Sequence, residues 1–201
     1  MGINLTGKLI LASASPRRSE LLKFLGLDFS VLPSDVPETP LAGETQEKHV
    51  LRLATEKANA LACQHAEAWV IGADTIVYLD GEILGKPSSR PDARQMLAKL
   101  SGRVHRVYTG FAVVCLARNV SACEVVESAV SFKDISAAER DWYVHTDEPY
   151  DKAGGYALQG SGAFFVREVQ GSYTNVIGLP LCEVISMLQR LGALEFSGSN
   201  K

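Results

Sequence analysis

Two serines and two arginines stand together at residues 13–18, in the order Ser-Ala-Ser-Pro-Arg-Arg. An apolar run precedes them, and Ser15 followed by Pro16 is typical of a helix start. A helix start presents unpaired N–H groups and a partial positive charge, so it suits an anion. Arg17 and Arg18 add positive charge where the helix dipole disfavours it, which indicates a compensating ligand such as a phosphate. A solvated helix start with surface arginines explains the pattern equally well.

Asp74 is an acidic residue inside an apolar stretch, between residues 70–71 (VI) and 76–77 (IV). Asp is depleted in strands, so a carboxylate there must be paired, bound to a metal or facing a cleft. It could hold a divalent metal on a phosphate or activate a water. The structural alternative is a buried carboxylate that accepts backbone N–H groups at a bulge. Ile76 stands where a phosphoaspartate enzyme would carry a second Asp, and the absence of a GxxxxGK[ST] loop excludes a P-loop NTPase.

Three further positions could contact a phosphate, a metal or a base. Lys86 stands between a glycine and a proline, and Glu38 lies alone in a proline-rich stretch, where it could supply a second metal carboxylate. Residues 151–160 (DKAGGYALQG) fail the GxGxxG spacing but could wrap a ligand closely. The amide of Gln159 could read a base edge. Each of these positions also fits an ordinary solvated loop.

Length and composition limit the class of protein. The chain has 201 residues, of which 46% are hydrophobic, and its net charge is −3, which together exclude a disordered chain. A pI near 5.8 argues against binding a nucleic-acid polymer. No apolar run reaches the roughly 18 residues of a membrane helix and no signal peptide is visible, so we expect a cytoplasmic protein that does not bind membranes. Four scattered cysteines and four histidines form no CxxC or HxxxH pair, which predicts reduced thiols and no Cys/His zinc site.

These residues need secondary structure that brings them together. Strands are predicted at residues 8–12, 29–32, 69–73, 76–84 (a hairpin around Asp80-Gly81), 104–117, 123–132 and, as a second hairpin, 164–169 with 175–178. Helices are predicted at residues 16–25, 45–67, 91–100, 136–145 and 180–191, with loops at 33–44 and 147–162. This order predicts an α/β fold with a mixed central sheet and helices on both sides. We expect one domain over residues 1–195 and a mobile tail at 196–201.

The motifs named above occur in the order and spacing of the Maf family, over residues 8–194. The matching stretches are 11–18 (LASASPRR), 72–75 (GADT), 85–87 (GKP), 100–102 (LSG), 151–160 (DKAGGYALQG) and 176–180 (VIGLP). The chain therefore resembles nucleoside triphosphate pyrophosphatases. This resemblance implies two lobes around a deep cleft, a fold similar to that of the inosine triphosphate pyrophosphatases, and a homodimer.

The resemblance also implies roles for individual residues. Asp74 is similar to the proton acceptor that activates water, and Lys86 and Glu38 are the other implied catalytic residues. Asp74 and Glu38 would hold a divalent metal, Mg²⁺ or Mn²⁺, and Lys57 is a weaker candidate for contact with metal or phosphates. The implied substrate-binding residues are Ser13, Ser15, Arg17, Arg18, Thr75, Lys152 and Gln159. Among them, Arg17, Thr75 and Gln159 occupy the positions that set base preference.

The activity implied is hydrolysis of the α–β phosphate bond of a nucleoside triphosphate to the monophosphate and pyrophosphate. Residues 151–160 look like those of the subfamily that acts on dTTP and UTP, and modified pyrimidine triphosphates are included in this expectation. Two alternatives stay open at this point. One is the subfamily that acts on 7-methyl-GTP, and the other is a non-catalytic nucleotide-binding regulator of septum formation.

Overall fold

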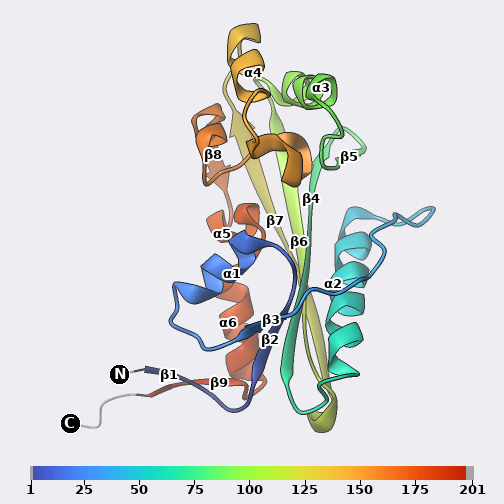
Figure 1. Cartoon of the computed structure of the whole chain (residues 1–201), viewed down its shortest axis with the longest axis vertical. Helices are drawn as coiled ribbons and strands as arrows, with labels where there is room; N and C mark the ends of the chain where they lie inside the picture. The colour runs from blue at the N-terminus through green and yellow to red at the C-terminus, as the bar shows by residue number, and fades with distance from the viewer. Residues whose placement is uncertain (1, 198–201) are drawn as a thin grey trace. The chain divides into compact units, whose positions relative to one another are not determined.

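A computed structural model describes residues 2–197, in which strands and helices are interleaved (Figure 1). The strands are β1 (Gly2–Leu5), β2 (Leu9–Ala12), β3 (Ser30–Val31), β4 (Trp69–Leu79), β5 (Glu82–Leu84), β6 (Val104–Cys115), β7 (Val120–Phe132), β8 (Val166–Gln170) and β9 (Leu194–Ser197). The α-helices are α1 (Pro16–Lys23), α2 (Gln46–Ala62), α3 (Arg90–Leu100), α4 (Ala137–Tyr143), α5 (Tyr173–Ile177) and α6 (Leu181–Arg190). Single 3₁₀ turns are η1 (Leu116–Arg118), η2 (Glu148–Asp151), η3 (Ala153–Gly155) and η4 (Ser161–Phe165).

The main sheet is mixed. Within the described residues it has seven strands in the order β3-β2-β4-β6-β7-β8, with β5 paired to β4. β2 pairs in parallel with β3 and β4, whereas β5 pairs antiparallel with β4, and β8 antiparallel with β7. The predicted fold class, α/β with a mixed central sheet, is confirmed.

The chain divides into two compact units. Of the described residues, unit 1 holds 2–74, 109–125 and 178–197, and unit 2 holds 75–108 and 126–177. Strands β4, β6 and β7 each contribute residues to both units.

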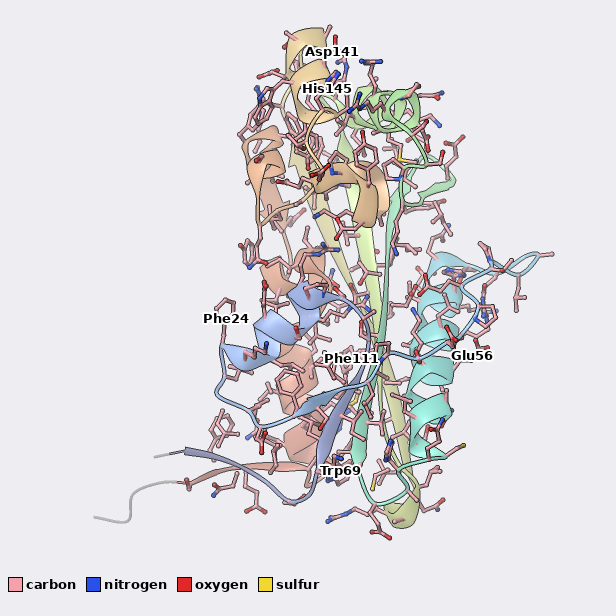
Figure 2. The ribbon with its side chains drawn as sticks, in the orientation of Figure 1. Phe24, Glu56, Trp69, Phe111, Asp141 and His145 are labelled. Atoms are coloured by element: carbon pink, nitrogen blue, oxygen red, sulfur yellow. The ribbon has the colours of Figure 1, made fainter. Side chains whose placement is uncertain are left out.

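In unit 1, α2 covers one face of the strands, and α1 and α6 lie on the other (Figure 1). Side chains alternate along a strand, so every second residue points toward α2. The apolar cluster of strand and α2 residues includes Ile10, Ala12, Ala54, Ala58, Val70 and Ala112. Trp69 and Phe111 are fully buried, whereas Phe24 beyond the end of α1 is 73% exposed (Figure 2).

Two glycines let α2 lie directly against the sheet. A Cβ on Gly72 in β4 would lie 2.1 Å from the carbonyl oxygen of Ala54 and 2.7 Å from the backbone nitrogen of Ala58. A Cβ on Gly110 in β6 would lie 2.4 Å from the carbonyl oxygen of Val50. Because these neighbours are backbone atoms, any side chain at either position would push the helix away. The backbone of α2 therefore rests on two neighbouring strands.

A second, two-stranded sheet joins the two ends of the described chain in unit 1. β1 pairs antiparallel with β9, from Gly2 opposite Ser197 to Leu5 opposite Leu194. No local pattern predicted this sheet, because its strands lie at opposite ends of the sequence. The tail predicted at 196–201 is wrong for Phe196 and Ser197, which belong to β9, and its remaining residues 198–201 lie outside the described residues.

Unit 2 contains the predicted hairpin and a separate apolar core. β4 and β5 pair across the Asp80-Gly81 turn, where both residues have positive φ, +49° and +89°. This conformation explains the Asp-Gly sequence. The core is formed by side chains from α3, β7, α4 and η4, among them Leu97, Phe132, Tyr143 and Phe165. The ring of Phe132 packs against that of Tyr156 in the glycine-rich segment, and the ring of Tyr143 packs against that of Phe165.

Several predicted element boundaries differ from those of the structure, and one predicted strand is a helix. Residues 175–178 do not form a strand, because residues 173–177 form α5, in which the buried Asn175 amide donates to Val107 and Ser128. β8 begins at Val166 and pairs with β7. α2 ends at Ala62 instead of residue 67, since the chain turns there to begin β4.

Candidate active site

The parallel pairing of β2, β3 and β4 brings three predicted site segments to one edge of the sheet in unit 1. Ala12, the last residue of β2, is level with Gly72 of β4, so Ser13 and Asp74 follow at the same end. β3 runs parallel to β2 and leads into the loop that carries Glu38. Open α/β sheets bind ligands outside the carboxyl ends of their parallel strands.

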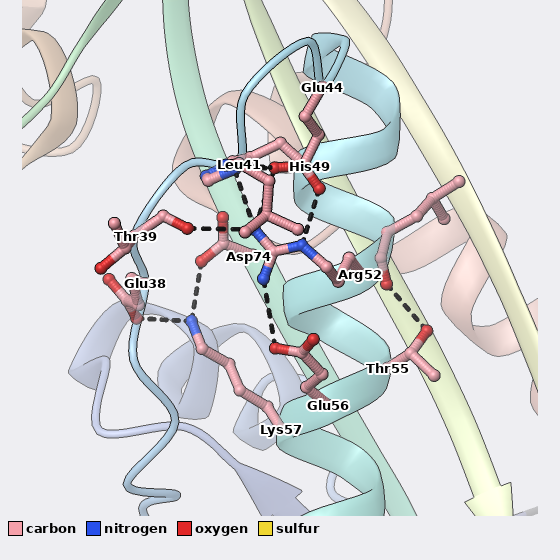
Figure 3. A network of polar contacts seen from close by, with 11 residues as sticks. Glu38, Thr39, Leu41, Glu44, His49, Arg52, Thr55, Glu56, Lys57 and Asp74 are labelled. Atoms are coloured by element: carbon pink, nitrogen blue, oxygen red, sulfur yellow. Dashed lines mark hydrogen bonds and ion pairs between the residues drawn. The ribbon is translucent and has the colours of Figure 1, made fainter.

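Lys57 joins two of the predicted carboxylates. Asp74 lies on the same face of β4 as Gly72, and its Oδ1 accepts a hydrogen bond from Lys57 Nζ at 2.7 Å. The same ammonium donates to Glu38 Oε1 at 2.5 Å (Figure 3). The side chains of Lys57 and Asp74 are 7% and 9% exposed, and that of Glu38 is 55% exposed. Asp74 is thus a buried, paired carboxylate, and Lys57, the weaker candidate from the sequence, connects it to a carboxylate that is open to solvent.

Arg18 is buried next to this cluster and bound by atoms of three chain segments. Its Nη1 donates to Ser13 Oγ at 3.0 Å and to the carbonyl oxygen of Ala73 at 2.8 Å. Its Nε donates to the carbonyl oxygen of Gly178 at 2.7 Å. Burial lowers the pKa of Arg18, and the negative charge of Asp74 opposes this effect. Since a guanidinium keeps its proton in proteins, Arg18 places a permanent positive charge beside Asp74.

The predicted helix start is confirmed in position. Ser15 is the N-cap residue of α1, and Pro16 is its first residue. The N–H of Ser15 donates to Ser13 Oγ at 3.3 Å, so both serines belong to one turn with Arg18. Arg17 is partly exposed on the same turn.

Arg52 holds the loop that carries Glu38. Its Nε and Nη2 donate to the two carboxylate oxygens of Glu44 at 2.7 and 2.9 Å, and Nη2 also donates to the carbonyl oxygen of Thr39 at 3.2 Å (Figure 3). The hydrogen bonds from Arg52, joined by one from His49 and opposed by burial, lower the pKa of Glu44 to about 2. Neither Arg52 nor Glu44 was predicted. The sequence did offer one signal for this pair, namely an acid just before a helix and an arginine two turns into it.

In unit 2, two predicted segments contact each other through their backbones. The N–H of Gly154 donates to the carbonyl oxygen of Gly85 at 3.0 Å. Gly154 and Gly155 have φ of +71° and +68°, values that favour glycine. This contact brings the segments of Lys86 and Lys152 side by side.

The remaining predicted residues have fewer described contacts. Thr75 is partly buried and follows Asp74 in β4, where the chain passes from unit 1 into unit 2. Lys86 and Gln159 are exposed. Contact of these three residues with a substrate stays a prediction.

Cys63, Cys115, Cys123 and Cys182 are free thiols in the structure. Within residues 2–197, no helix combines the length and apolar character needed to cross a membrane.

The candidate site lies next to the end of the parallel pairing between β2 and β4. It contains a buried arginine and a carboxylate pair that is bridged by a lysine. The chain is thus an α/β protein whose site suits a charged small molecule. Comparison with known families narrows this class. The chain belongs to the Maf family, since the family model described as Maf-like protein matches residues 8–191. The resemblance drawn from the sequence motifs is therefore confirmed.

Several relatives carry the name dTTP/UTP pyrophosphatase. The protein of Syntrophus aciditrophicus is 56% identical over 194 residues, covering 96% of this chain and 95% of the relative. Those of Geobacter sulfurreducens and Myxococcus xanthus are 50% and 51% identical, covering 94% and 92% of this chain and 98% and 92% of the relatives. Among solved structures, this chain is similar to a dITP/XTP pyrophosphatase from Mycobacterium abscessus (17% identity, TM-score 0.43, covering 92% of this chain and 97% of that one). It is also similar to the Ham1 protein of Staphylococcus aureus (18% identity, TM-score 0.47, with the same coverage).

Proposed function

We propose that this chain hydrolyses the bond between the α- and β-phosphates of nucleoside triphosphates, preferably dTTP and UTP, to the monophosphate and pyrophosphate. Relatives with this name that are 50–56% identical over 92–96% of the chain support the proposal. The observation that carries it is the buried carboxylate of Asp74, which lies two residues beyond the stretch of β4 that pairs in parallel with β2 and is joined to Glu38 by Lys57.

In the proposed reaction, the oxygen of a water attacks the α-phosphorus, and its proton passes to the carboxylate of Asp74. The new P–O bond forms as the bond from the α-phosphorus to the bridging oxygen breaks, and pyrophosphate leaves with that oxygen. General base catalysis supplies about 10²–10⁴-fold. The larger share must come from placing the water in line with the leaving group and from stabilising charge on the phosphates.

Cationic side chains are proposed to stabilise the triphosphate. Arg18 is suited to this role because its charge is permanent and its guanidinium is fixed by hydrogen bonds to Ser13, Ala73 and Gly178. A fixed cation needs no rearrangement as charge develops in the transition state. Ser13, Ser15, Lys86 and Lys152 complete the proposed phosphate-binding set.

Base preference is proposed to depend on Arg17, Thr75 and Gln159. A side-chain amide offers one acceptor and two donors, which suits the edge of a pyrimidine. A site that hydrogen-bonds a base rejects bases that leave its polar groups unpaired, so such contacts give stronger discrimination than shape alone.

Asp74 and Glu38 are proposed to hold a divalent metal, Mg²⁺ or Mn²⁺. Their oxygens already converge on one cation, the Lys57 ammonium, at 2.7 and 2.5 Å. Carboxylate oxygens suit both ions, and Mg²⁺ is commonly held by one or two carboxylates together with water and substrate phosphates. When bound, such an ion offsets the negative charge of the phosphates.

The experiment that tests the proposal is a panel of nucleoside triphosphates with detection of released pyrophosphate, in the presence of Mg²⁺. We expect dTTP and UTP to give the highest kcat/KM among dTTP, UTP, CTP, GTP, ATP and 7-methyl-GTP. A preference for 7-methyl-GTP would contradict the proposed substrate. Nucleotide binding with no release of pyrophosphate from any substrate would contradict the proposed reaction and favour a regulatory protein.

A further inference from the structure

The carboxylate of Glu148 lies inside the turn of residues 157–162, which carries Gln159. Its Oε2 accepts the N–H of Ser161 at 2.7 Å, and its Oε1 accepts the N–H of Gly162 at 2.8 Å. These two bonds hold the side of the turn that follows Gln159. Glu148 itself belongs to η2, which precedes the glycine-rich segment.

Tyr143 holds the other side of the same turn. Its hydroxyl donates to Glu148 Oε1 at 2.8 Å and accepts the N–H of Ala157 at 3.3 Å. Tyr143 is fully buried in the apolar core of unit 2, so its hydroxyl is a fixed point. The residues before and after Gln159 are therefore held by one connected pair, Tyr143 and Glu148.

The turn fits this pair so closely that two of its residues are glycines. A Cβ on Gly160, whose φ is +154°, would lie 2.6 Å from Glu148 Oε2. A Cβ on Gly162 would lie 2.7 Å from the hydroxyl oxygen of Tyr143. A side chain at either position would require the Glu148 carboxylate, the Tyr143 hydroxyl or the turn itself to move.

The ionisation states favour the same arrangement. Burial opposes ionisation of Glu148, but the N–H groups of Gly162 and Ser161 and the Tyr143 hydroxyl outweigh it and lower the pKa of Glu148. Burial, together with the adjacent Glu148, raises the pKa of Tyr143, so that its hydroxyl stays protonated and can donate. A charged acceptor makes each of these hydrogen bonds stronger than a neutral one would.

The backbone of Glu148 also binds a second predicted site residue. Its carbonyl oxygen accepts a hydrogen bond from Lys152 Nζ at 2.7 Å, and Asp151 Oδ1 accepts another from the same ammonium. Lys152 is therefore held by the main chain of the residue whose side chain holds the Gln159 turn.

We propose that Glu148 is a positioning residue for substrate selection, because its carboxylate fixes the turn that presents Gln159 while its carbonyl oxygen holds Lys152. The proposal rests on the proposed function, in which Gln159 reads the base and Lys152 binds phosphate. Glu148 itself does not touch the substrate. It sets the angle at which the base-reading amide faces a pyrimidine.

The test is Glu148→Gln, measured with dTTP and CTP. The amide keeps one acceptor oxygen but replaces the other with a donor, which cannot accept the N–H of Ser161 or Gly162. The carbonyl of residue 148 is unchanged, so the contact with Lys152 is retained. We expect KM for dTTP to rise about tenfold, kcat to change less than about threefold, and the preference for dTTP over CTP to fall by a similar factor of about ten.

Two further variants separate positioning from a general loss of stability. Tyr143→Phe removes the hydroxyl that holds Ala157 and should lower the same dTTP preference, which keeps the proposal testable if Glu148→Gln does not fold. Glu139→Gln is the matched control, because Glu139 also accepts a backbone N–H, that of Ser136, but at the start of α4. Glu139→Gln should lower the thermal unfolding midpoint without changing the dTTP preference.

The outcomes distinguish this inference from the function it rests on. Wild-type protein that releases no pyrophosphate from dTTP would overturn the proposed function, and the inference with it. Active wild-type protein together with a Glu148→Gln variant of unchanged KM and unchanged preference would overturn the inference alone. A Glu148→Gln variant in which kcat falls and KM does not would also overturn it.

Discussion

Lys57 and Asp74 form an ion pair of 2.7 Å in which both side chains are less than one-tenth exposed. One residue lies on α2 and the other on β4, so the pair joins helix and strand inside unit 1. Breaking a buried pair by removing one partner is costly, because the remaining charge keeps its desolvation penalty.

Lys57→Met should therefore lower the free energy of unfolding by about 3–5 kcal/mol. The double variant Lys57→Met/Asp74→Asn should recover part of this loss, because the uncompensated charge is gone. Urea denaturation of Lys57→Met, Asp74→Asn and the double variant measures the three free energies of unfolding. Lys99→Met is the control, since Lys99 and its partner Glu82 are 40% and 61% exposed, and it should cost less than about 1 kcal/mol. A double variant whose loss equals the sum of the two single losses would show that the residues are not coupled.

Asp74→Asn should lower kcat for dTTP by about 10²–10⁴-fold, because the amide cannot accept the proton of the attacking water. Nucleotide binding should persist, which is measured as the Kd of a non-hydrolysable dTTP analogue. Glu82→Gln, at an exposed carboxylate outside the candidate site, should leave both values unchanged. Full activity in the Asn variant would remove Asp74 from the mechanism.

Gly72→Ala should destabilise the fold by about 1–3 kcal/mol, since its Cβ would meet the backbone of α2. Thermal unfolding of the variant measures the effect. Gly7→Ala is the matched control, because its Cβ would make only ordinary contacts, at 3.5 Å from the Trp69 ring and 3.9 Å from the carbonyl oxygen of Glu67. Equal unfolding midpoints for the two variants would show that α2 can move away from residue 72 with little loss of stability.

Acid should remove the stability that the ion pair of Glu44 and Arg52 contributes to the fold. The pKa of Glu44 is about 2 in the fold against an ordinary value of 4.5, so the pair stabilises the fold above pH 4.5 and loses this contribution as the pH falls toward 2. The difference in free energy of unfolding between wild type and Glu44→Gln should accordingly be largest near neutral pH and shrink below pH 4.5. Denaturation at several pH values measures it, and a difference that does not change with pH would contradict the assignment.

Gln159→Ala should raise KM for dTTP more than it lowers kcat, because the amide is proposed to bind the base and not the reacting phosphates. Steady-state kinetics with dTTP and UTP measure both constants. Gln189→Ala, on the exposed side of α6, is the control and should behave as wild type. Unchanged kinetics in the Gln159 variant would exclude this residue from base recognition.

Local signals account for the parts of the fold that the sequence predicted. The Asp80-Gly81 hairpin and the helix predicted from residue 136 depend on neighbouring residues. The structure confirms the hairpin, and it starts α4 with a capping box of Ser136 and Glu139. The pairing of β1 with β9 depends on strands at opposite ends of the chain, so no local pattern reveals it. Residues 175–178 were predicted as the second strand of a hairpin with residues 164–169, but residues 173–177 form α5. In this helix the buried side-chain amide of Asn175 donates to Val107 and Ser128, contacts that depend on distant parts of the chain.

The same difference between local signals and long-range contacts decides which residues of the candidate site could be predicted. Asp74 stood out because an acid in an apolar strand is unusual. The lysine at 57 lay on the apolar face of a predicted helix, where spacing alone gives it no partner. Glu148 had no signal beyond an acid before a proline, since its role depends on backbone groups 13 and 14 residues further along the chain.

The contact of α2 with Gly72 and Gly110 limits how the site can vary among related proteins. Main-chain atoms of α2 set its separation from the strands, and a side chain at Gly72 or Gly110 would push the helix away. A substitution on the outer face of α2 leaves these contacts in place, so we expect it not to change the distance between Lys57 and Asp74. The loop of Glu38 is held by side chains, through hydrogen bonds from Arg52 to Thr39 and from Lys57 to Glu38. We therefore expect substitutions in that loop, and not on the outer face of α2, to change the distance between the two carboxylates.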